Sequence, residues 1–261
     1  KTLQILNGIA VVCTIVIVYM SNTAIFNGKT MASVSAEYQN LFTPAGYAFS
    51  IWGLIYLSLL GFVIYYGRSL FNANIKEDNT VKQVGWWFFI SCLVNSLWVV
   101  AWLYEFTLVS VFLMLVLLFS LLRIVVKTET ELHNAPLKKF LFLFWPFCIY
   151  SGWVSVALIA NIAAYLTKTG WAGFGISETF WTIIMIVVAA MVHIFMIWKR
   201  NMREFALVLV WSLIAIAVAN KNENVTVVWA AIIVAILVFI NIIIHGFQNR
   251  KSNPFLHKSA R

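Results

Sequence analysis

Apolar runs long enough to cross a lipid bilayer recur along the whole chain, and this feature constrains the fold most. A transmembrane helix needs about 20 mostly apolar residues. Inside a bilayer no water satisfies the backbone, so each run must be helical or part of a closed barrel. These runs are too long and too uniformly apolar for barrel strands. The sequence therefore predicts an all-α, polytopic transmembrane bundle of eight helices, over residues 2–20, 46–67, 84–104, 107–126, 140–166, 178–199, 204–219 and 225–246.

The composition excludes a soluble domain. Hydrophobic residues make up 62% of the 261 residues and charged residues only 10%, whereas soluble domains carry about 25% charged residues. The net charge of +9 does not indicate a nucleic-acid partner, because the basic residues lie in connecting segments and form no single stripe. The partner that we expect is the lipid bilayer. The three cysteines fall inside apolar runs without metal-ligand spacing, which indicates no metal site.

Lysine and arginine residues are distributed unequally between the two sets of loops. One set holds only Lys29, Lys168 and Lys221. The other set holds Lys1, Arg68, Lys76, Lys82, Arg123, Lys127, Lys138, Lys139, Lys199, Arg200, Arg203, Arg250, Lys251, Lys258 and Arg261. Cytoplasmic loops carry the excess of positive charge. With an even number of helices, this predicts a multi-pass protein of the cell (inner) membrane with both termini in the cytoplasm.

The helix interiors contain no lysine, arginine, aspartate or glutamate near mid-span. Ion-coupled transporters, proton pumps and voltage sensors need such groups despite the cost of burying them, so the sequence argues against these classes. His193 and His245 lie near helix ends and could in principle ligate haem iron. A hydrogen-bonded packing role is the favoured interpretation of a lone intramembrane histidine.

Three of the expected helices carry stripes in which large aromatic residues lie beside small or amide residues. The stripes are Phe49, Trp52, Gly53 and Tyr56 in the first, Ser91, Asn95, Trp98, Trp102 and Glu105 in the second, and Tyr150, Trp153, Ala157, Ala160, Asn161 and Ala164 in the third. Each follows the helical period. Ordinary helix packing could explain any one stripe. Three together favour a shared internal pocket, which would suit a flat apolar ligand.

At these residues the chain resembles the TspO/translocator protein family, also called tryptophan-rich sensory proteins. The segment FTPAGYAFSIWGLIY is similar to the opening of that family's second helix, and Asn95 and Trp98 match the N-x-x-W of its third helix. Residues 150–161 reproduce the pattern Y-x-x-W-V-S-x-A-x-x-x-N of its fifth helix. This last match is the most specific, and all three motifs occur in the family's order.

The chain departs from the family pattern in several places. Ala45 stands where the family has a second proline, Tyr47 replaces a tryptophan, and the acidic residue often found early in the fourth helix is missing near Ser110. The family fold has five helices. We therefore expect a TspO-like bundle over residues 1–167, three additional transmembrane helices over 168–247 and a basic cytoplasmic tail over 248–261.

The resemblance implies a binding or sensory protein for a flat hydrophobic ligand such as a tetrapyrrole or sterol. Residues 21–45 would form a lid, and a porphyrin or haem could be the bound group. The pocket residues that the resemblance implies are Trp52, Asn95, Trp98, Tyr150, Trp153, Ala157 and Asn161. The aromatic stripes add Phe49, Tyr56 and Trp102 as expected ligand-binding residues. No catalytic residue is predicted, and enzymatic breakdown of porphyrins stays an open question with a non-enzymatic role favoured.

Three further interpretations stay open. The chain could be a transporter or facilitator of a small lipophilic metabolite, although no repeat relates its two halves, as alternating access usually requires. It could be a structural subunit of a larger membrane complex, docked through the three additional helices. It could also assemble as a homodimer.

Overall fold

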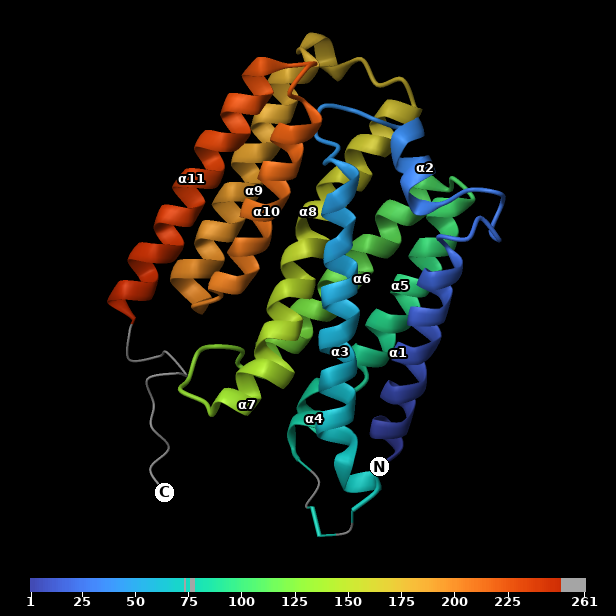
Figure 1. Cartoon of the computed structure of the whole chain (residues 1–261), viewed down its shortest axis with the longest axis vertical. Helices are drawn as coiled ribbons and strands as arrows, with labels where there is room; N and C mark the ends of the chain where they lie inside the picture. Colours follow the sequence, from blue (N-terminus) through green and yellow to red (C-terminus); the bar gives the residue numbers. More distant parts are fainter. Residues whose placement is uncertain (73, 76–77, 250–261) are drawn as a thin grey trace.

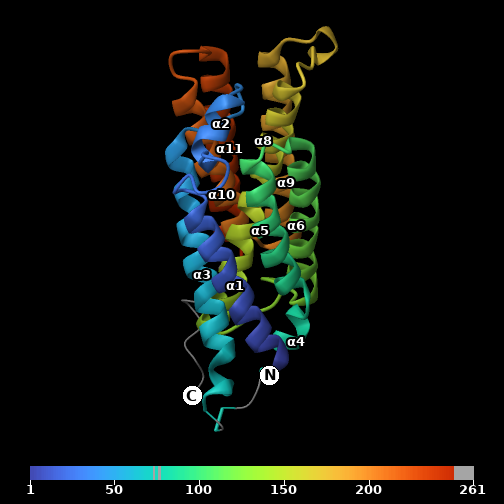
Figure 2. The same cartoon turned by 90° about the vertical axis from the view of Figure 1, so that its right-hand side faces the viewer.

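A computed structural model describes residues 1–72, 74–75 and 78–249 of the chain. The described part is a helical bundle whose long helices run along one common axis (Figures 1 and 2). The α-helices are α1 (Thr2–Met20), α2 (Met31–Glu37), α3 (Ile51–Gly67), α4 (Thr80–Val84), α5 (Trp87–Leu103), α6 (Thr107–Lys127), α7 (Leu137–Lys139), α8 (Trp145–Lys168), α9 (Glu178–Arg200), α10 (Arg203–Ala219) and α11 (Val225–Gln248). The predicted all-α class is confirmed.

Six helical segments are long and apolar enough to cross a membrane. They are Thr2–Met20, Gly46–Leu70, Thr107–Lys127, Leu137–Lys168, Glu178–Arg200 and Val225–Gln248. The two other long helices, α5 and α10, have 17 residues each, at the lower limit of the usual range of about 17–25. The chain is a multi-pass membrane protein with six candidate spans, and a long helix lies at each of the eight predicted positions.

The structure differs from the sequence-based expectation mainly in short elements. The helices α2 and α4 were not predicted, because runs of seven and five residues are too short for an apolar period to stand out. Helix α8 begins at Trp145 and not at residue 140, since a π-helical turn, Phe140–Phe144, precedes it. Pro146 lies in the first turn of α8, where its missing N–H costs no intrahelical hydrogen bond.

Helix α8 joins the two halves of the bundle. It lies between α1, α3, α5 and α6 on one side and α9, α10 and α11 on the other (Figure 1). Most of α8 is buried, whereas α1 and α11 keep most of their residues at the surface. Gly152 of α8 meets the backbone of Phe205 in α10, and a Cβ at Gly152 would lie 2.7 Å from the Phe205 oxygen. A glycine is therefore required where these helices cross.

Both the start of α1 and the end of α11 lie at one end of the molecule (Figure 1). The loops that follow α3, α6 and α9 lie at this same end and carry most of the described basic residues. We call it the basic end, and we call the end that carries α2 the lid end. Lys76 and residues 250–261 of the expected basic tail lie outside the described residues.

Candidate ligand-binding site

Trp52 of α3 is the centre of an aromatic cluster contributed by α3, α5 and α8. Its ring stacks on Tyr56 at a centroid distance of 5.5 Å and lies 5.8 Å from the ring of Trp98 in α5. Two residues of α8 approach it edge-on, with Tyr150 at 5.9 Å and Trp153 at 6.2 Å. Such edge-to-face and offset arrangements are the favourable geometries for aromatic pairs. The three stripes of the sequence thus meet in space.

Two buried asparagines of the stripes are hydrogen-bonded across helices. The Asn95 amide nitrogen in α5 donates to the Tyr56 hydroxyl at 2.7 Å. The Ser110 hydroxyl in α6 donates to the Asn161 side-chain oxygen in α8 at 2.8 Å. An amide in hydrocarbon needs a partner, and these two bonds fix the α3–α5 and α6–α8 contacts around the cluster. Ser110 takes this role near the position where the family often carries an acidic residue.

Two small cavities adjoin Trp52, and the expected site residues divide between them. The larger set, Phe49, Trp52, Trp98, Trp102, Trp153, Ala157 and Asn161, lines a cavity of about 50 Å³. A neighbouring cavity of about 90 Å³ shares Phe49, Trp52 and Trp98 and adds Tyr56. Asn95 and Tyr150 line neither cavity, and they lie behind the walls in contact with Tyr56 and Trp52.

The cavities are closed to a ligand of tetrapyrrole size as they stand. Small-molecule sites usually enclose about 300–1,000 Å³, several times the space beside Trp52. The Trp52 and Trp98 rings are shared by both cavities. A movement of these rings together with the lid would join the two spaces, so ligand entry requires a conformational change.

The walls carry polar atoms that the described part of the protein leaves unused. The indole nitrogens of Trp98 and Trp153 are buried and have no acceptor among the described residues. The buried side-chain oxygen of Asn95 likewise has no donor among them. Both tryptophans line the 50 Å³ cavity. An unpartnered buried donor is costly. A ligand with carboxylate or carbonyl oxygens would satisfy these indole N–H groups.

The segment 21–45 covers the cluster at the lid end, as the resemblance implied. Met31, Ser35 and Tyr38 of this segment line the 50 Å³ cavity. Helix α2 begins with a capping box in which Thr30 and Ser33 exchange side-chain and backbone hydrogen bonds. These bonds make a short helix stable at this position. The lid is therefore an ordered helix with its own start signal.

A charged network fastens the lid to the helices below it. Lys29 pairs with Glu105, in the turn between α5 and α6, and lies 2.6 Å from the Glu37 carboxylate. The Tyr38 hydroxyl also donates to Glu105, and Lys168 at the end of α8 donates to the Glu105 backbone oxygen at 2.6 Å. We call Lys29, Tyr38, Glu105 and Lys168 the latch.

The contacts of the latch change the pKa values of Glu105, Lys29 and Tyr38. The hydrogen bond from Lys29 is the main cause that lowers the pKa of Glu105, and the same bond raises the pKa of Lys29. Burial first, and then Glu105, raises the pKa of Tyr38 to about 12. The charged forms of Lys29 and Glu105 and the neutral form of Tyr38 are thus all favoured, and these are the forms that the latch requires.

The other end of the lid rests on α10. The Ala45 backbone N–H donates to the Ala215 oxygen at 3.0 Å. The Trp211 indole N–H donates to the Ala48 oxygen at 3.3 Å, and its ring meets Tyr47 edge-on at 5.2 Å. The additional helices therefore help to position the lid. Tyr47, which departs from the family pattern, is one of the residues that make this contact.

A family model described as TSPO-like protein matches residues 4–244 of the chain. The chain belongs to the TSPO-like protein family. Comparison with curated proteins and with solved structures gave no match. The match to the TSPO-like model continues through α9, α10 and most of α11, so it is not confined to the five helices that carry the motifs.

Several functional contacts of this TSPO-like protein were not predicted from the sequence. Glu105 was placed on an aromatic stripe, but its pairing with Lys29 and Tyr38 was not anticipated. Charged residues in two short polar loops were the only available signal, and they do not specify a pairing. His193 is accounted for by packing, because its two ring nitrogens lie 2.7 Å from the Ala189 oxygen and 3.3 Å from the Ser155 hydroxyl.

Proposed function

We propose that this TSPO-like membrane protein binds or senses a flat hydrophobic ligand, tetrapyrrole-like or sterol-like, in the aromatic cluster beneath the lid. The observation that carries the proposal is the aromatic cluster around Trp52, in which the buried indole N–H groups of Trp98 and Trp153 have no acceptor among the described residues. The rings offer stacking and edge contacts to a flat ligand, and the two N–H groups offer hydrogen bonds to its polar substituents.

The aromatic walls would recognise the ring of a porphyrin. Among the described residues that line the two cavities there is no histidine or cysteine, but Met31, Tyr38 and Tyr56 line them, and methionine and tyrosine also occur as axial ligands of haem iron. The free base protoporphyrin is the appropriate first probe, because it tests the ring contacts alone. Haem would bind through the same ring contacts.

Binding is favoured over passage through the bundle. Toward the basic end, Phe62, Phe88 and Phe147 pack against one another with centroid distances of 5.1–6.0 Å. These fully buried rings fill the space below Tyr56. A facilitator would need a continuous path there. The structural-subunit alternative has no specific support, since the exposed apolar face of α11 suits lipid as well as a partner.

We also propose eight spans with the basic end in the cytoplasm of the cell in which the chain is made. Helices α5 and α10 run alongside the longer spans in both views (Figures 1 and 2). A reporter fused after residue 261 should read cytoplasmic. An external signal from that fusion would exclude this orientation.

The binding proposal is tested with protoporphyrin and the purified full-length protein in a mild detergent. We expect a shifted porphyrin absorption band that saturates with protein concentration. Trp153→Phe keeps a ring but removes the N–H donor, and we expect it to weaken binding by roughly 10- to 150-fold, which corresponds to one hydrogen bond to a charged group. We expect Trp98→Phe to weaken protoporphyrin binding by a similar factor.

The matched control is Trp229→Phe. Trp229 lies on the exposed face of α11, and 59% of its surface is accessible. This variant should bind protoporphyrin as the unmodified protein does. If Trp98→Phe and Trp153→Phe also leave the affinity unchanged, the pocket is assigned to the wrong residues.

A further inference from the structure

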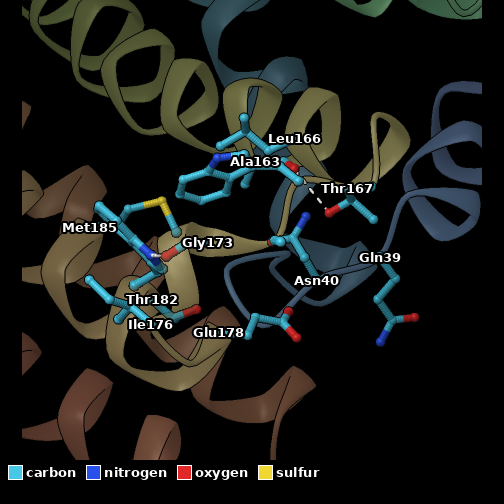
Figure 3. A pocket seen from close by; sticks show the side chains of 14 residues that line it. Gln39, Asn40, Ala163, Leu166, Thr167, Gly173, Ile176, Glu178, Thr182 and Met185 are labelled. Carbon is cyan, nitrogen blue, oxygen red and sulfur yellow. Dashed lines mark hydrogen bonds between the residues drawn. The ribbon is translucent and has the colours of Figure 1, made fainter.

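A second and larger cavity opens at the lid end, between the ends of α8 and α9 and the lid residues Gln39 and Asn40 (Figure 3). Its volume is about 480 Å³, within the range of small-molecule sites. It shares no lining residue with the two cavities beside Trp52. It is built by the lid, the end of α8, the loop that follows α8 and the first turns of α9.

Two tryptophans give this cavity an aromatic wall. Trp171 and Trp181 both line it, with ring centroids 5.2 Å apart and ring planes inclined by 56°. The Trp181 indole donates to the Gly173 oxygen at 2.8 Å, and the Trp171 backbone N–H donates to the Leu166 oxygen at 3.1 Å. Both side chains are only half-exposed. The wall is thus held in place before any ligand arrives.

Glu178 is the single ionisable side chain that lines the cavity. In Figure 3 its carboxylate lies at the rim, near Asn40 and Thr167 across the opening. One carboxylate oxygen accepts the Leu41 backbone N–H at 3.0 Å. Within residues 1–72, 74–75 and 78–249, no lysine or arginine forms an ion pair with Glu178. The cavity therefore presents a negative charge without a basic side-chain partner beside an aromatic wall.

The charge around the cavity is consistent with a cationic ligand. Two of the three lysines at the lid end, Lys29 and Lys168, are already held by Glu105. On the α9 side, a second carboxylate, Glu223, accepts a hydrogen bond from Gln39 of the cavity wall at 3.4 Å. The third lysine, Lys221, lies in the same loop as Glu223. In a chain with a net charge of +9, the lid end thus carries four carboxylates, Glu37, Glu105, Glu178 and Glu223, against three lysines.

Two simpler explanations account for only part of these observations. Tryptophans near helix ends often belong to the interfacial belt, but Trp181 uses its N–H inside the fold and not at the headgroups. A carboxylate in a first helical turn stabilises the helix dipole. The Ser177 side chain already caps α9 by accepting a hydrogen bond from the Phe180 backbone N–H. Neither explanation requires a cavity of about 480 Å³.

We propose that this cavity binds a small organic cation with a quaternary ammonium group. The methyl groups would lie against the Trp171 and Trp181 rings, whose faces attract cations, and the Glu178 carboxylate would balance the charge. A free solute and the choline headgroup of a lipid share this chemistry. The proposal is independent of ligand binding beside Trp52.

The test uses calorimetric titration of choline into the purified full-length protein in an uncharged maltoside detergent. The comparison ligand is the neutral carbon isostere of choline, in which a quaternary carbon replaces the nitrogen. We expect choline to bind at least about threefold more tightly than this isostere, as a partly exposed cation–π contact and one exposed ion pair together imply. Equal binding of the two compounds, or no binding of either, would overturn the proposal without any variant.

Two variants then locate the site. Glu178→Gln keeps an oxygen for the Leu41 N–H but removes the charge, and Trp171→Leu removes part of the wall. Each should weaken choline binding at least about threefold, whereas the control Glu129→Gln, an exposed carboxylate at the basic end, should change it by less than about twofold. Circular dichroism and protoporphyrin binding show that each variant is folded. If a folded Glu178→Gln or Trp171→Leu protein binds choline as the unmodified protein does, the site is excluded.

Lipid nanodiscs distinguish the two sources of the cation. If a phosphatidylcholine headgroup fills the site, free choline will bind in discs of a lipid without choline, such as phosphatidylglycerol, and will no longer bind in discs of phosphatidylcholine. If the natural ligand is a free solute, choline will bind in these discs as tightly as in detergent. Both results support the site, and they differ in the ligand that they assign to it.

Discussion

Glu131 is a buried acidic residue in a polar loop at the basic end. It lies in the loop after α6, is 4% exposed, and accepts a weak hydrogen bond from the Cys148 thiol at 3.6 Å. Burial first, and then the neighbouring Glu204 carboxylate, raises the pKa of Glu131 well above its ordinary value. A proton on Glu131 would allow the two carboxyls to form a hydrogen bond with one another.

This residue should make the stability of the protein depend on pH. The pKa of Glu131 is higher in the folded state than in the unfolded state, so its contribution is fully present at low pH. That contribution is lost as the pH rises through the raised value. We expect the melting temperature to fall as the pH rises above the ordinary range of a glutamate carboxyl, and Glu131→Gln to remove much of this fall. Scanning fluorimetry across a series of pH values measures both.

Glu129→Gln is the matched control for Glu131→Gln. Glu129 lies in the same loop, is exposed, and pairs with His133 at 3.1 Å. Its replacement should leave the pH dependence of the melting temperature nearly unchanged. A pH dependence that persists in Glu131→Gln would show that other groups cause it.

At the scale of the helix pair, Gly152 sets the distance between α8 and α10. A Cβ at this position would lie 2.7 Å from the oxygen and 3.1 Å from the Cα of Phe205. These are backbone atoms, which cannot move aside as a side chain could. We therefore expect Gly152→Ala to destabilise the protein by about 1–3 kcal/mol, the usual cost of overpacking. Thermal melting in detergent measures the change.

Gly53 in α3 provides the comparison for this variant, because a Cβ there would meet no atom within 4 Å. Gly53→Ala should be neutral or slightly stabilising, since alanine is the better helix former. Equal melting temperatures for the two variants would contradict the close α8–α10 approach.

We expect the contacts of the latch to set how easily the lid opens. Glu105 contacts Lys29, Tyr38 and Lys168 at once, so Glu105→Gln should weaken several partly exposed contacts together. We expect protoporphyrin to associate roughly two- to fivefold faster with this variant, which corresponds to the modest energy of exposed pairs. Stopped-flow absorbance measures this rate.

Glu37→Gln is the control that shows whether faster association requires loss of the Glu105 contacts or follows from removing any carboxylate near Lys29. It removes the exposed Lys29–Glu37 pair and leaves the Glu105 contacts in place. Its association rate should stay near that of the unmodified protein. If Glu105→Gln does not accelerate association, the lid does not limit ligand entry.

At the scale of the whole molecule, the sequence was sufficient to predict the long helices, because each one depends on a local apolar run. The convergence of Trp52, Trp98 and Trp153 was also predictable in outline, since helical periodicity places each of them on one face. The latch was not predictable, because Lys29 and Glu105 are 76 positions apart in loops without periodicity. The same holds for the contact of Trp211 with the lid.

The small volume of the cavities beside Trp52 also lay beyond sequence analysis. The stripes predict which residues face one another, but side-chain rotamers decide how much space is left. Trp52 fills much of that space in the closed structure. The account of the whole molecule therefore joins three parts: an aromatic cluster, a lid that closes it, and additional helices that position the lid.

The most direct test of this account is to map where a tetrapyrrole binds. Protoporphyrin that carries a diazirine on one propionate would be photolysed with the full-length protein, with and without excess unmodified protoporphyrin, and the crosslinked residues identified by mass spectrometry. The account predicts that the competed crosslinks lie in α3, α5, α8 and residues 21–45, next to Trp52, Trp98 and Trp153. Competed crosslinks confined to α9, α10 and α11, or to the lipid-facing surface, would contradict it.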